Sequence, residues 1–342
     1  MTNAKRKTRV PPPRDPMRPV AIAGTGSYLP ERVLTNADLE KMVDTNDEWI
    51  VTRTGIRERR IAKPEEKTSD MAAAAARRAL RQAHVPASSL DGIVVATLTP
   101  DMVMPNTACI VQDVLGAKKA GCFDIEAACS GFTYGLDIGR HFVASGAMDN
   151  VLVVGVEKLS TVIDWEDRTT CILFGDGAGA AVLQSRDPGH HIVASAMGSN
   201  GTLADLLYIP AGGTRHPTTA QTVAEKLHYV RMGGREVFKH AVTQMCKVGR
   251  KALSNCGLNV EDVDWFIPHQ ANIRIIQAVA DRLGTPMEKW FLNIERYGNM
   301  SAASAAVALD EAVRSGSVQD GDVVLMIVFG GGFTWGAMVL QW

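Results

Sequence analysis

Residues 123–132 read FDIEAACSGF, and residues 292–304 read LNIERYGNMSAAS. In each stretch an apolar, strand-like run gives way to small residues that open a helical pattern. Cys129 lies 170 positions before Asn299, and Asp124 lies 169 positions before Asn293. The two stretches are therefore interpreted as copies of one strand-to-helix junction.

The similarity continues outward from these junctions. The pair Ser145-Gly146 lies 170 positions before Ser315-Gly316, and each pair is followed by an apolar strand, VLVVGV at 151–156 and VVLMIVF at 323–329. A near-constant offset across separate features predicts an internal duplication. The alternative is a pair of unrelated α/β units with similar turns.

Periodicity places strands and helices alternately along the chain. Strand-like runs fall at 20–24, 92–97, 122–127, 151–156, 178–183, 192–197, 264–267, 291–294, 323–329 and 336–341. Helical patterns fall at 70–83, 106–115, 131–145, 233–255, 271–283 and 301–315. This order predicts an α/β protein with two βαβ-rich halves around a layered core. We expect a basic, proline-rich, disordered tail at 1–19, a first half at 20–185 and a second half at 190–342.

Composition narrows the function classes. The 342 residues suffice for about two domain-sized units, and 36 Lys+Arg against 37 Asp+Glu leave a net charge of −1. Nucleic acid and membrane surfaces are therefore not expected partners, and no apolar run reaches the ~20 residues of a membrane span. Six cysteines without a C-x-x-C pair indicate reduced thiols, a cytoplasmic location and no metal site.

Three polar side chains lie at strand-to-helix junctions. Cys129 faces the positive end of helix 131–145, which is expected to lower the pKa of its thiol and favour the thiolate. His269 precedes helix 271–283, and its imidazole can donate to a developing negative charge. Asn299 takes in the second copy the place of Cys129 in the first and adds an N–H donor. The alternatives are a buried structural cysteine, a histidine without a role and a helix N-cap.

Two further patterns have both a functional and a structural interpretation. The three glycines 330–332 after strand 323–329 let backbone N–H groups line a site closely, or form a turn. The second pattern is an aromatic plate beside a run of arginines, which suits a phosphorylated adenine nucleotide such as coenzyme A or else forms a solvated charged face. Its members are Trp49, Arg53, Arg57, Arg59 and Arg60.

Four of these motifs together carry a family resemblance. Cys129 in AACSGF, His269 in PHQANIRI, Asn299 in YGNMSAAS and the GGGFTWG loop resemble β-ketoacyl-acyl-carrier-protein synthase III, a member of the thiolase superfamily. The stretches 24–62 and 174–183 resemble this family equally closely, so the similarity runs from about residue 20 to Trp342. The resemblance implies a duplicated thiolase-like fold, layered α/β/α/β/α with two mixed sheets, and a homodimer.

The resemblance also implies an activity, the condensation of an acyl-CoA with malonyl-acyl-carrier protein that initiates fatty-acid synthesis. Cys129 would take the acyl group, and the backbone N–H groups of Cys129 and Gly331 would form the oxyanion hole. His269 and Asn299 would stabilise the enolate that decarboxylation leaves. The coenzyme A thioester is then a substrate, and no cofactor is expected.

Other positions take their expected roles from the same motifs. Coenzyme A contacts are expected at Trp49, Arg53, Arg168, Gly234 and Asn272. The acyl pocket and channel are expected at Met104, Phe174, Met232 and Phe329, with Met104 as the gate to acyl length. A docking surface for an acidic carrier protein is expected at Gln270, Ala271, Asn272, Ile273, Arg274 and Lys239.

Departures and alternatives accompany this interpretation. Met300 stands where the family usually has Thr, and Asp281 stands where a basic residue is common, which puts the support of Asn299 and the docking surface in question. A related condensing enzyme of polyketide or quinolone-type metabolism is one alternative. The order Cys–His–Asn also fits a papain-like hydrolase, although AACSG lacks the tryptophan of the papain signature.

Overall fold

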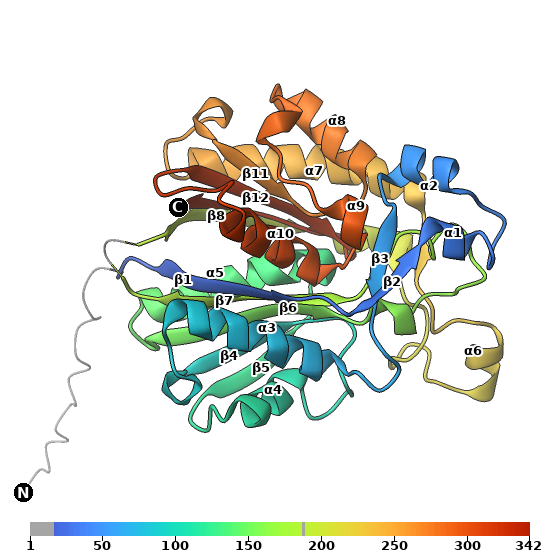
Figure 1. The fold of residues 1–342 in the computed structure, drawn as a ribbon, viewed down its shortest axis with the longest axis horizontal. Helices are drawn as coiled ribbons and strands as arrows, with labels where there is room; N and C mark the ends of the chain where they lie inside the picture. The colour runs from blue at the N-terminus through green and yellow to red at the C-terminus, as the bar shows by residue number, and fades with distance from the viewer. Residues whose placement is uncertain (1–16, 187–188) are drawn as a thin grey trace, which may run out of the picture.

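The structure is a computed structural model, and it describes residues 17–186 and 189–342. Figure 1 shows two stacked halves with helices between them and on their outer faces. Most of the tail expected at 1–19 lies outside the described residues. Arg18 belongs to the folded body, because its guanidinium donates to the carbonyl oxygens of Val143 (2.8 Å) and Met148 (2.9 Å).

The first half contains five strands of a mixed sheet, in the order β5-β4-β6-β7-β1. Strands β5, β4 and β6 are parallel, whereas β7 and β1 are antiparallel to their neighbours. The bounds are β1 Ala21–Tyr28, β4 Gly92–Ala96, β5 Gly121–Ile125, β6 Asn150–Glu157 and β7 Gly177–Gln184. Strands β4 and β6 are buried almost throughout and rich in Val, as expected of strands covered by helices on both faces.

The second half contributes four strands in the order β11-β12-β13-β8. Their bounds are β8 His191–Ser199, β11 Trp265–Pro268, β12 Val323–Gly330 and β13 Thr334–Gln341. One residue pair, Ala21 and His191, joins β1 to β8. The two expected sheets are therefore the two halves of one continuous nine-stranded sheet.

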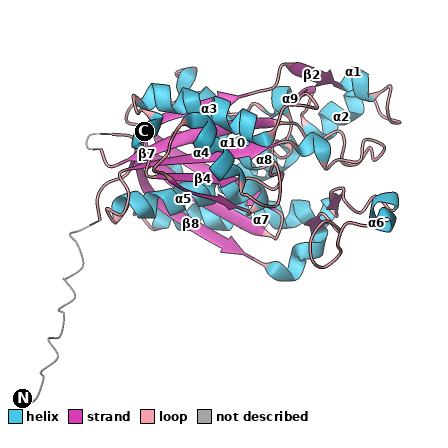
Figure 2. Ribbon diagram, turned by 90° about the horizontal axis from the view of Figure 1, so that it is seen from below, coloured by secondary structure: helices cyan, strands magenta, loops and turns pink. Residues whose placement is uncertain are grey.

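Helices form three layers around these sheet halves (Figures 1 and 2). The central layer holds α5 Gly131–Ala144 and α10 Ala302–Arg314; the outer layers hold α3 Thr68–Ala83 and α4 Thr107–Leu115, and α7 Gly234–Ser254 and α8 Ile273–Leu283. The largest core cluster joins Phe132 of α5 and Leu309 of α10 to Val153 and Val328 from the two sheet halves. The layered α/β fold expected from the sequence is confirmed.

The second half repeats the arrangement of the first half but has one strand fewer. Strands β4 and β11 begin 173 residues apart, as do β6 and β12, and helices α5 and α10 begin 171 residues apart. The prediction of a strand at 291–294 is wrong. There the chain makes one bridge between Phe266 and Trp290, whose rings stack at 4.6 Å, and then turns into α9 Ile294–Tyr297.

Small residues hold the central helices close to the strands. A Cβ atom at Gly135 of α5 would lie 2.8 Å from Val153, and one at Gly155 of β6 would lie 2.5 Å from the carbonyl oxygen of Ala302. These contacts leave no room for a larger residue. They hold α5 and the start of α10 against the same strand, β6, and Cys129 and Asn299 lie just before these two helices.

Short elements cover one end of the sheet, at the right of Figure 1. The sequence analysis predicted none of them. The helices among them have eight residues or fewer, and strands such as β2 (RVLT) and β3 (ERRI) carry charged residues in place of an apolar run. They are β2 Arg32–Thr35, α1 Asn36–Leu39, α2 Asp47–Thr54, β3 Glu58–Ile61, β9 Leu207–Tyr208, α6 Ala220–Ala224 and β10 Arg231–Met232. Within residues 17–186 and 189–342, no helix has both the length and the apolarity to cross a bilayer.

Candidate active site

Cys129 lies in a one-turn 3-10 helix, Ala128–Ser130, between β5 and α5. The preceding residue, Ala128, has a φ of 45°, which is a strained value for a residue with a Cβ atom. Two contacts hold this bend: the N–H of Ala128 donates to Oε1 of Glu126 (2.8 Å), and the Thr334 hydroxyl donates to the carbonyl oxygen of Ala127 (2.9 Å). The thiol-bearing residue is thereby fixed at the start of α5.

Asn299 is held by backbone contacts on both sides. Its own N–H donates to the carbonyl oxygen of Leu173 (2.8 Å), and its Oδ1 accepts from the N–H of Ser301 (2.8 Å). Because Oδ1 is engaged, the side-chain NH₂ group is the part of the amide that can donate into the cavity. The Met300 side chain plays no part in these contacts, so the departure at this position leaves Asn299 supported.

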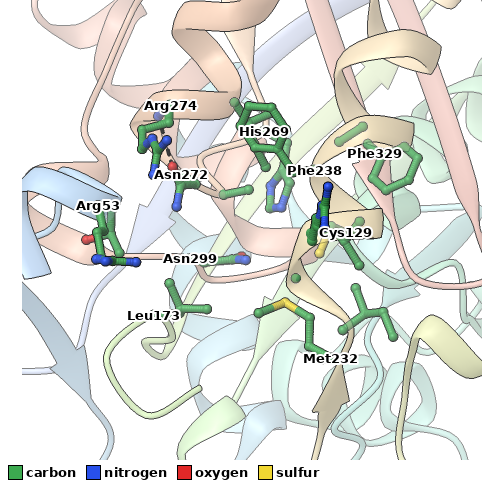
Figure 3. Close-up of a pocket in the computed structure, with 18 of the residues that line it drawn as sticks. Arg53, Cys129, Leu173, Met232, Phe238, His269, Asn272, Arg274, Asn299 and Phe329 are labelled. Atoms are coloured by element: carbon green, nitrogen blue, oxygen red, sulfur yellow. Dashed lines mark hydrogen bonds between the residues drawn. The ribbon is translucent and has the colours of Figure 1, made fainter. Parts of the chain in front are cut away.

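His269 directly follows β11, and its backbone N–H donates to the carbonyl oxygen of Ile327 in β12 (2.8 Å). Cys129, His269 and Asn299 line one cavity of about 660 Å³, and Figure 3 shows their side chains converging there. The thiol comes from the first half of the chain, and the other two come from the second. The cavity lies between the halves, where the helix starts of both copies meet.

Burial controls the charge of the Cys129 thiol and of the His269 imidazole. Cys129 is 7% exposed, and burial raises the pKa of its thiol to about 12. Desolvation of the thiolate thus outweighs the lowering of the pKa expected from the helix N-terminus. Burial also lowers the pKa of His269 to about 3. The imidazole is thus neutral at pH 7 and can donate an N–H without carrying a charge.

The glycine-rich turn between β12 and β13 lies against the nucleophile. A Cβ atom at Gly330 would lie 2.7 Å from the backbone nitrogen of Cys129 and 3.1 Å from that of Ser130. Gly331 follows at once and packs near the carbonyl oxygen of Leu207. The turn can approach the Cys129 amide this closely only because it lacks side chains.

The residues expected to contact coenzyme A separate into two groups. Arg53, Gly234 and Asn272 line the cavity. Trp49 and Arg168 lie beside its mouth, where the Arg53 and Arg168 guanidinium carbons are 4.6 Å and 5.3 Å from the centre of the Trp49 ring. The aromatic plate expected from the sequence is thus flanked by two cations.

Most of the neighbouring arginine run has a structural role. The guanidinium of Arg59 is fully buried and donates to Oδ1 of Asn36 (2.9 Å) and to the carbonyl oxygen of Ile172 (2.7 Å). Arg57 forms an ion pair with Glu295 at 2.9 Å. Of the four arginines in this run, Arg53 alone lines the cavity.

Three of the four expected acyl-channel residues, Phe174, Met232 and Phe329, line the cavity. Met104 does not. Its side chain is 84% exposed in a loop with Met102 and Val103, which are 48% and 95% exposed. The gate to acyl length expected at Met104 is therefore not part of the lining of this cavity.

Only some residues of the expected docking surface are exposed. Gln270 is fully buried, and its side chain links the carbonyl oxygens of Pro268 and Phe291 to the backbone N–H of Asn293, so its assignment to docking is wrong. Arg274 is exposed at the cavity mouth, with Ala271 beside it. Among the other members, Asn272 caps α8, Ile273 packs on Gly55, and Lys239 pairs with Glu236 at 2.9 Å.

Sequence reasoning missed several residues of the site. Leu173 and Phe238 line the cavity, and no motif singled them out (Figure 3). Glu157 and Ser301 lie behind Cys129 and were also missed. One signal was available: Glu157 is the only charged residue of β6 and directly follows the apolar run 151–156. In the described part of the chain, no cluster of three or more His, Cys, Asp or Glu side chains could hold a metal ion.

Two family models match the chain. One is described as 3-Oxoacyl-[acyl-carrier-protein (ACP)] synthase III and matches residues 123–201; the other describes the C terminal of the same synthase and matches residues 253–342. The chain is 55% identical over 321 residues to the β-ketoacyl-[acyl-carrier-protein] synthase III of Caldanaerobacter subterraneus, which covers 94% of this chain and 97% of that protein. The corresponding protein of Clostridioides difficile is 52% identical, with 94% and 98% covered.

Solved structures agree with this match. The 3-oxoacyl-[acyl-carrier-protein] synthase III of Aquifex aeolicus superposes with a TM-score of 0.88 at 52% identity, covering 94% of this chain and 100% of that one. The priming β-ketosynthase of the R1128 polyketide pathway superposes with a TM-score of 0.89 at 41% identity, covering 97% and 99%. On both sequence and structure, this chain belongs to the β-ketoacyl-[acyl-carrier-protein] synthase III family.

Proposed function

We propose that this protein condenses a primer acyl-CoA with malonyl-acyl-carrier protein, releasing CO₂ and coenzyme A and forming a 3-oxoacyl-carrier protein that initiates fatty-acid synthesis. Membership of the synthase III family supports this activity. The observation that carries it is the meeting of Cys129, His269 and Asn299 in one cavity. A nucleophile and two neutral donors are what two successive thioester reactions require.

The first half-reaction is acyl transfer to Cys129. Its sulfur attacks the acyl-CoA carbonyl carbon, the carbon–sulfur bond to coenzyme A breaks, and an acyl-enzyme forms. The backbone N–H groups of Cys129 and Gly331 donate to the oxyanion. The close approach of the 330–332 turn to the Cys129 amide supports this assignment.

The second half-reaction is decarboxylation followed by carbon–carbon bond formation. His269 and the NH₂ group of Asn299 donate to the thioester oxygen of the malonyl group and stabilise the enolate that loss of CO₂ creates. A neutral imidazole suits this role, since burial keeps the pKa of His269 low. Decarboxylation itself supplies the carbanion, so the reaction as proposed needs neither a metal nor a redox cofactor.

Substrate entry is assigned to the cavity mouth. The adenine of coenzyme A stacks on Trp49 beside Arg168, while Arg53, Gly234 and Asn272 follow its phosphates and pantetheine arm inward. The two guanidinium groups beside the Trp49 ring support this path. Arg274 and Lys239 at the mouth offer positive charge to an acidic carrier protein.

Assembly as a homodimer is also proposed. The exposed apolar run 102–104 is a surface that a second copy would cover. In such a dimer Met104 would act as the acyl gate of the partner's cavity. A cytoplasmic location is supported by the six free cysteines.

The alternatives have weaker support. The relatives at 52% to 55% identity bear the name β-ketoacyl-[acyl-carrier-protein] synthase III, whereas the R1128 priming ketosynthase is 41% identical. A cysteine hydrolase would leave Trp49 and the two guanidinium groups of Arg53 and Arg168 beside its ring unexplained.

Intact-mass analysis with a panel of acyl-CoAs tests the proposal. We expect a single acyl adduct on the wild-type protein and none on the Cys129→Ala variant. His269→Ala and Asn299→Ala should still acylate but decarboxylate malonyl-carrier protein about 10²- to 10³-fold more slowly. An unmodified wild-type protein with every acyl-CoA would overturn the function.

A further inference from the structure

A buried carboxylate that this mechanism does not use lies behind Cys129. Glu157 is the last residue of β6 and is 0% exposed. Its Oε2 accepts from the hydroxyls of Thr99 (2.7 Å) and Thr97 (3.2 Å) and from the N–H of Leu98 (3.2 Å). Among the described residues, Oε1 receives only a longer bond of 3.3 Å from Leu98. One oxygen of the carboxylate therefore keeps the capacity to take a proton.

The Ser301 hydroxyl lies between this carboxylate and the thiol. Ser301 is 1% exposed, and its Oγ has no hydrogen bond of good geometry within the described part of the chain. Such an unpaired buried hydroxyl calls for an explanation. The start of α10 lies against the start of α5, because a Cβ atom at Gly131 would lie 3.5 Å from the Cβ atom of Ala302. In this setting the Ser301 hydroxyl lowers the pKa of both Cys129 and Glu157.

The packing of β6 and β7 against the start of α10 brings Glu157 close to Ser301. Gly155 lies on the same face of β6 as Glu157, and a Cβ atom there would lie 2.5 Å from the carbonyl oxygen of Ala302. Gly177, which pairs with Glu157 across the sheet, would place a Cβ atom 2.6 Å from the sulfur of Met300. Glu157 is thus directed at residues 300–302.

Other charged groups nearby point elsewhere. Lys158 sends its ammonium group to the carbonyl oxygens of Lys63 (2.8 Å) and Pro64 (3.0 Å). The buried carboxylate of Asp176 is engaged by the N–H and hydroxyl groups of Ser160 and by the N–H of Ala62. Glu126, on the side of Cys129, raises the pKa of the thiol, as does the charge of Glu157 itself.

Acylation requires a group that removes the thiol proton. His269 is a poor acceptor, because burial lowers the pKa of its imidazole to about 3. Burial raises the pKa of Glu157 to about 7, which makes it the more basic of the two. We propose that Ser301 and Glu157 form a proton relay, which takes the thiol proton of Cys129 and returns it when the thiolate is released. This proposal rests on the proposed condensation.

The relay balances protons over the whole cycle. In acylation the Sγ–H bond of Cys129 breaks, its proton passes to Oγ of Ser301, and the Ser301 hydroxyl proton passes to Oε1 of Glu157. The thiolate then expels coenzyme A as a thiolate, which takes a proton from solvent. In condensation the enolate carbon displaces the Cys129 thiolate, and Glu157 returns its proton through Ser301. Glu157 acts through Ser301 and is a positioning residue.

Glu157→Gln and Ser301→Ala test the relay, with Glu157→Asp as the conservative variant. Ser301→Ala removes the hydroxyl and keeps the backbone N–H that holds Asn299. Quenched-flow mass analysis of acetyl transfer from acetyl-CoA, from pH 6 to pH 9, should show a wild-type rate that rises through a titration near pH 7. The Gln and Ala variants should lose this titration and acylate about 10²-fold more slowly at pH 7.5. Glu157→Asp should restore the titration.

Two controls separate the relay from folding and from the proposed function. Asp310→Asn removes another buried carboxylate, which is bonded to Thr25, Ser27 and Arg314 and follows Ser301 by nine residues, and it should keep the wild-type pH profile. Iodoacetamide alkylation of Cys129, followed by peptide mass mapping, measures the thiolate without any thioester. Wild-type rates and pH profiles in folded Glu157→Gln or Ser301→Ala would overturn the relay, whereas failure of the wild-type protein to acylate would overturn the proposed function.

Discussion

At the scale of single residues, burial of His269 makes the stability of the protein depend on pH. The pKa of its imidazole is about 3 in the folded protein and about 6.5 in an unfolded chain. Between these values the unfolded state binds the extra proton, so His269 lowers stability as pH falls from about 6.5. His269→Gln should therefore gain stability relative to wild type on acidification, by up to about 1.4 kcal/mol per pH unit. Urea denaturation of both proteins at pH 7.5 and 5.5 measures this difference, and an unchanged difference would contradict a neutral His269.

At the scale of elements, the contact between the β12–β13 turn and the Cys129 backbone is the tightest requirement of the site. Gly330→Ala would place a methyl group 2.7 Å from the Cys129 nitrogen, so the turn must move away from the oxyanion site. We expect acylation by acetyl-CoA to slow by about 10²-fold, comparable to the loss of one oxyanion donor. Gly201→Ala, where a Cβ atom meets nothing within 4 Å, is the matched control and should acylate normally. Equal acylation rates in the two variants would refute the assignment of the turn.

The elements also differ in how well the sequence predicts them. The long strands and helices were predictable because burial between layers imposes regular apolar patterns on them. The segment 291–294 carries such a pattern but packs as a loop, since the apolar contacts of Trp290 with Phe266 satisfy it without a ladder. Gln270 is polar in sequence yet buried, because its partners are backbone groups that no motif reveals. The direction of the Cys129 pKa shift was missed for a related reason: desolvation depends on the assembled cavity.

At the scale of the whole molecule, the exposed apolar run 102–104 is the surface that we expect a second copy to cover. Val103 is 95% exposed, so Val103→Asp should not destabilise a single chain. We expect the wild-type protein to sediment at twice the 36.8 kDa of one chain, and Val103→Asp to shift it toward the monomer. Val223→Asp, at a 47% exposed position on α6, is the control and should stay dimeric. A monomeric wild-type protein would rule out the homodimer.

The lost fifth strand of the second half has a consequence for growth of the sheet. Beyond β11 the chain folds over the last strand with Trp290, whereas β5 at the opposite end pairs only with β4 among the described strands. A sheet with one end covered and one end available can be extended only once, by an identical end related by a twofold axis. The missing strand thus leaves a sheet with two unlike ends, and among the described strands the β5 end is the one whose outer edge has no partner.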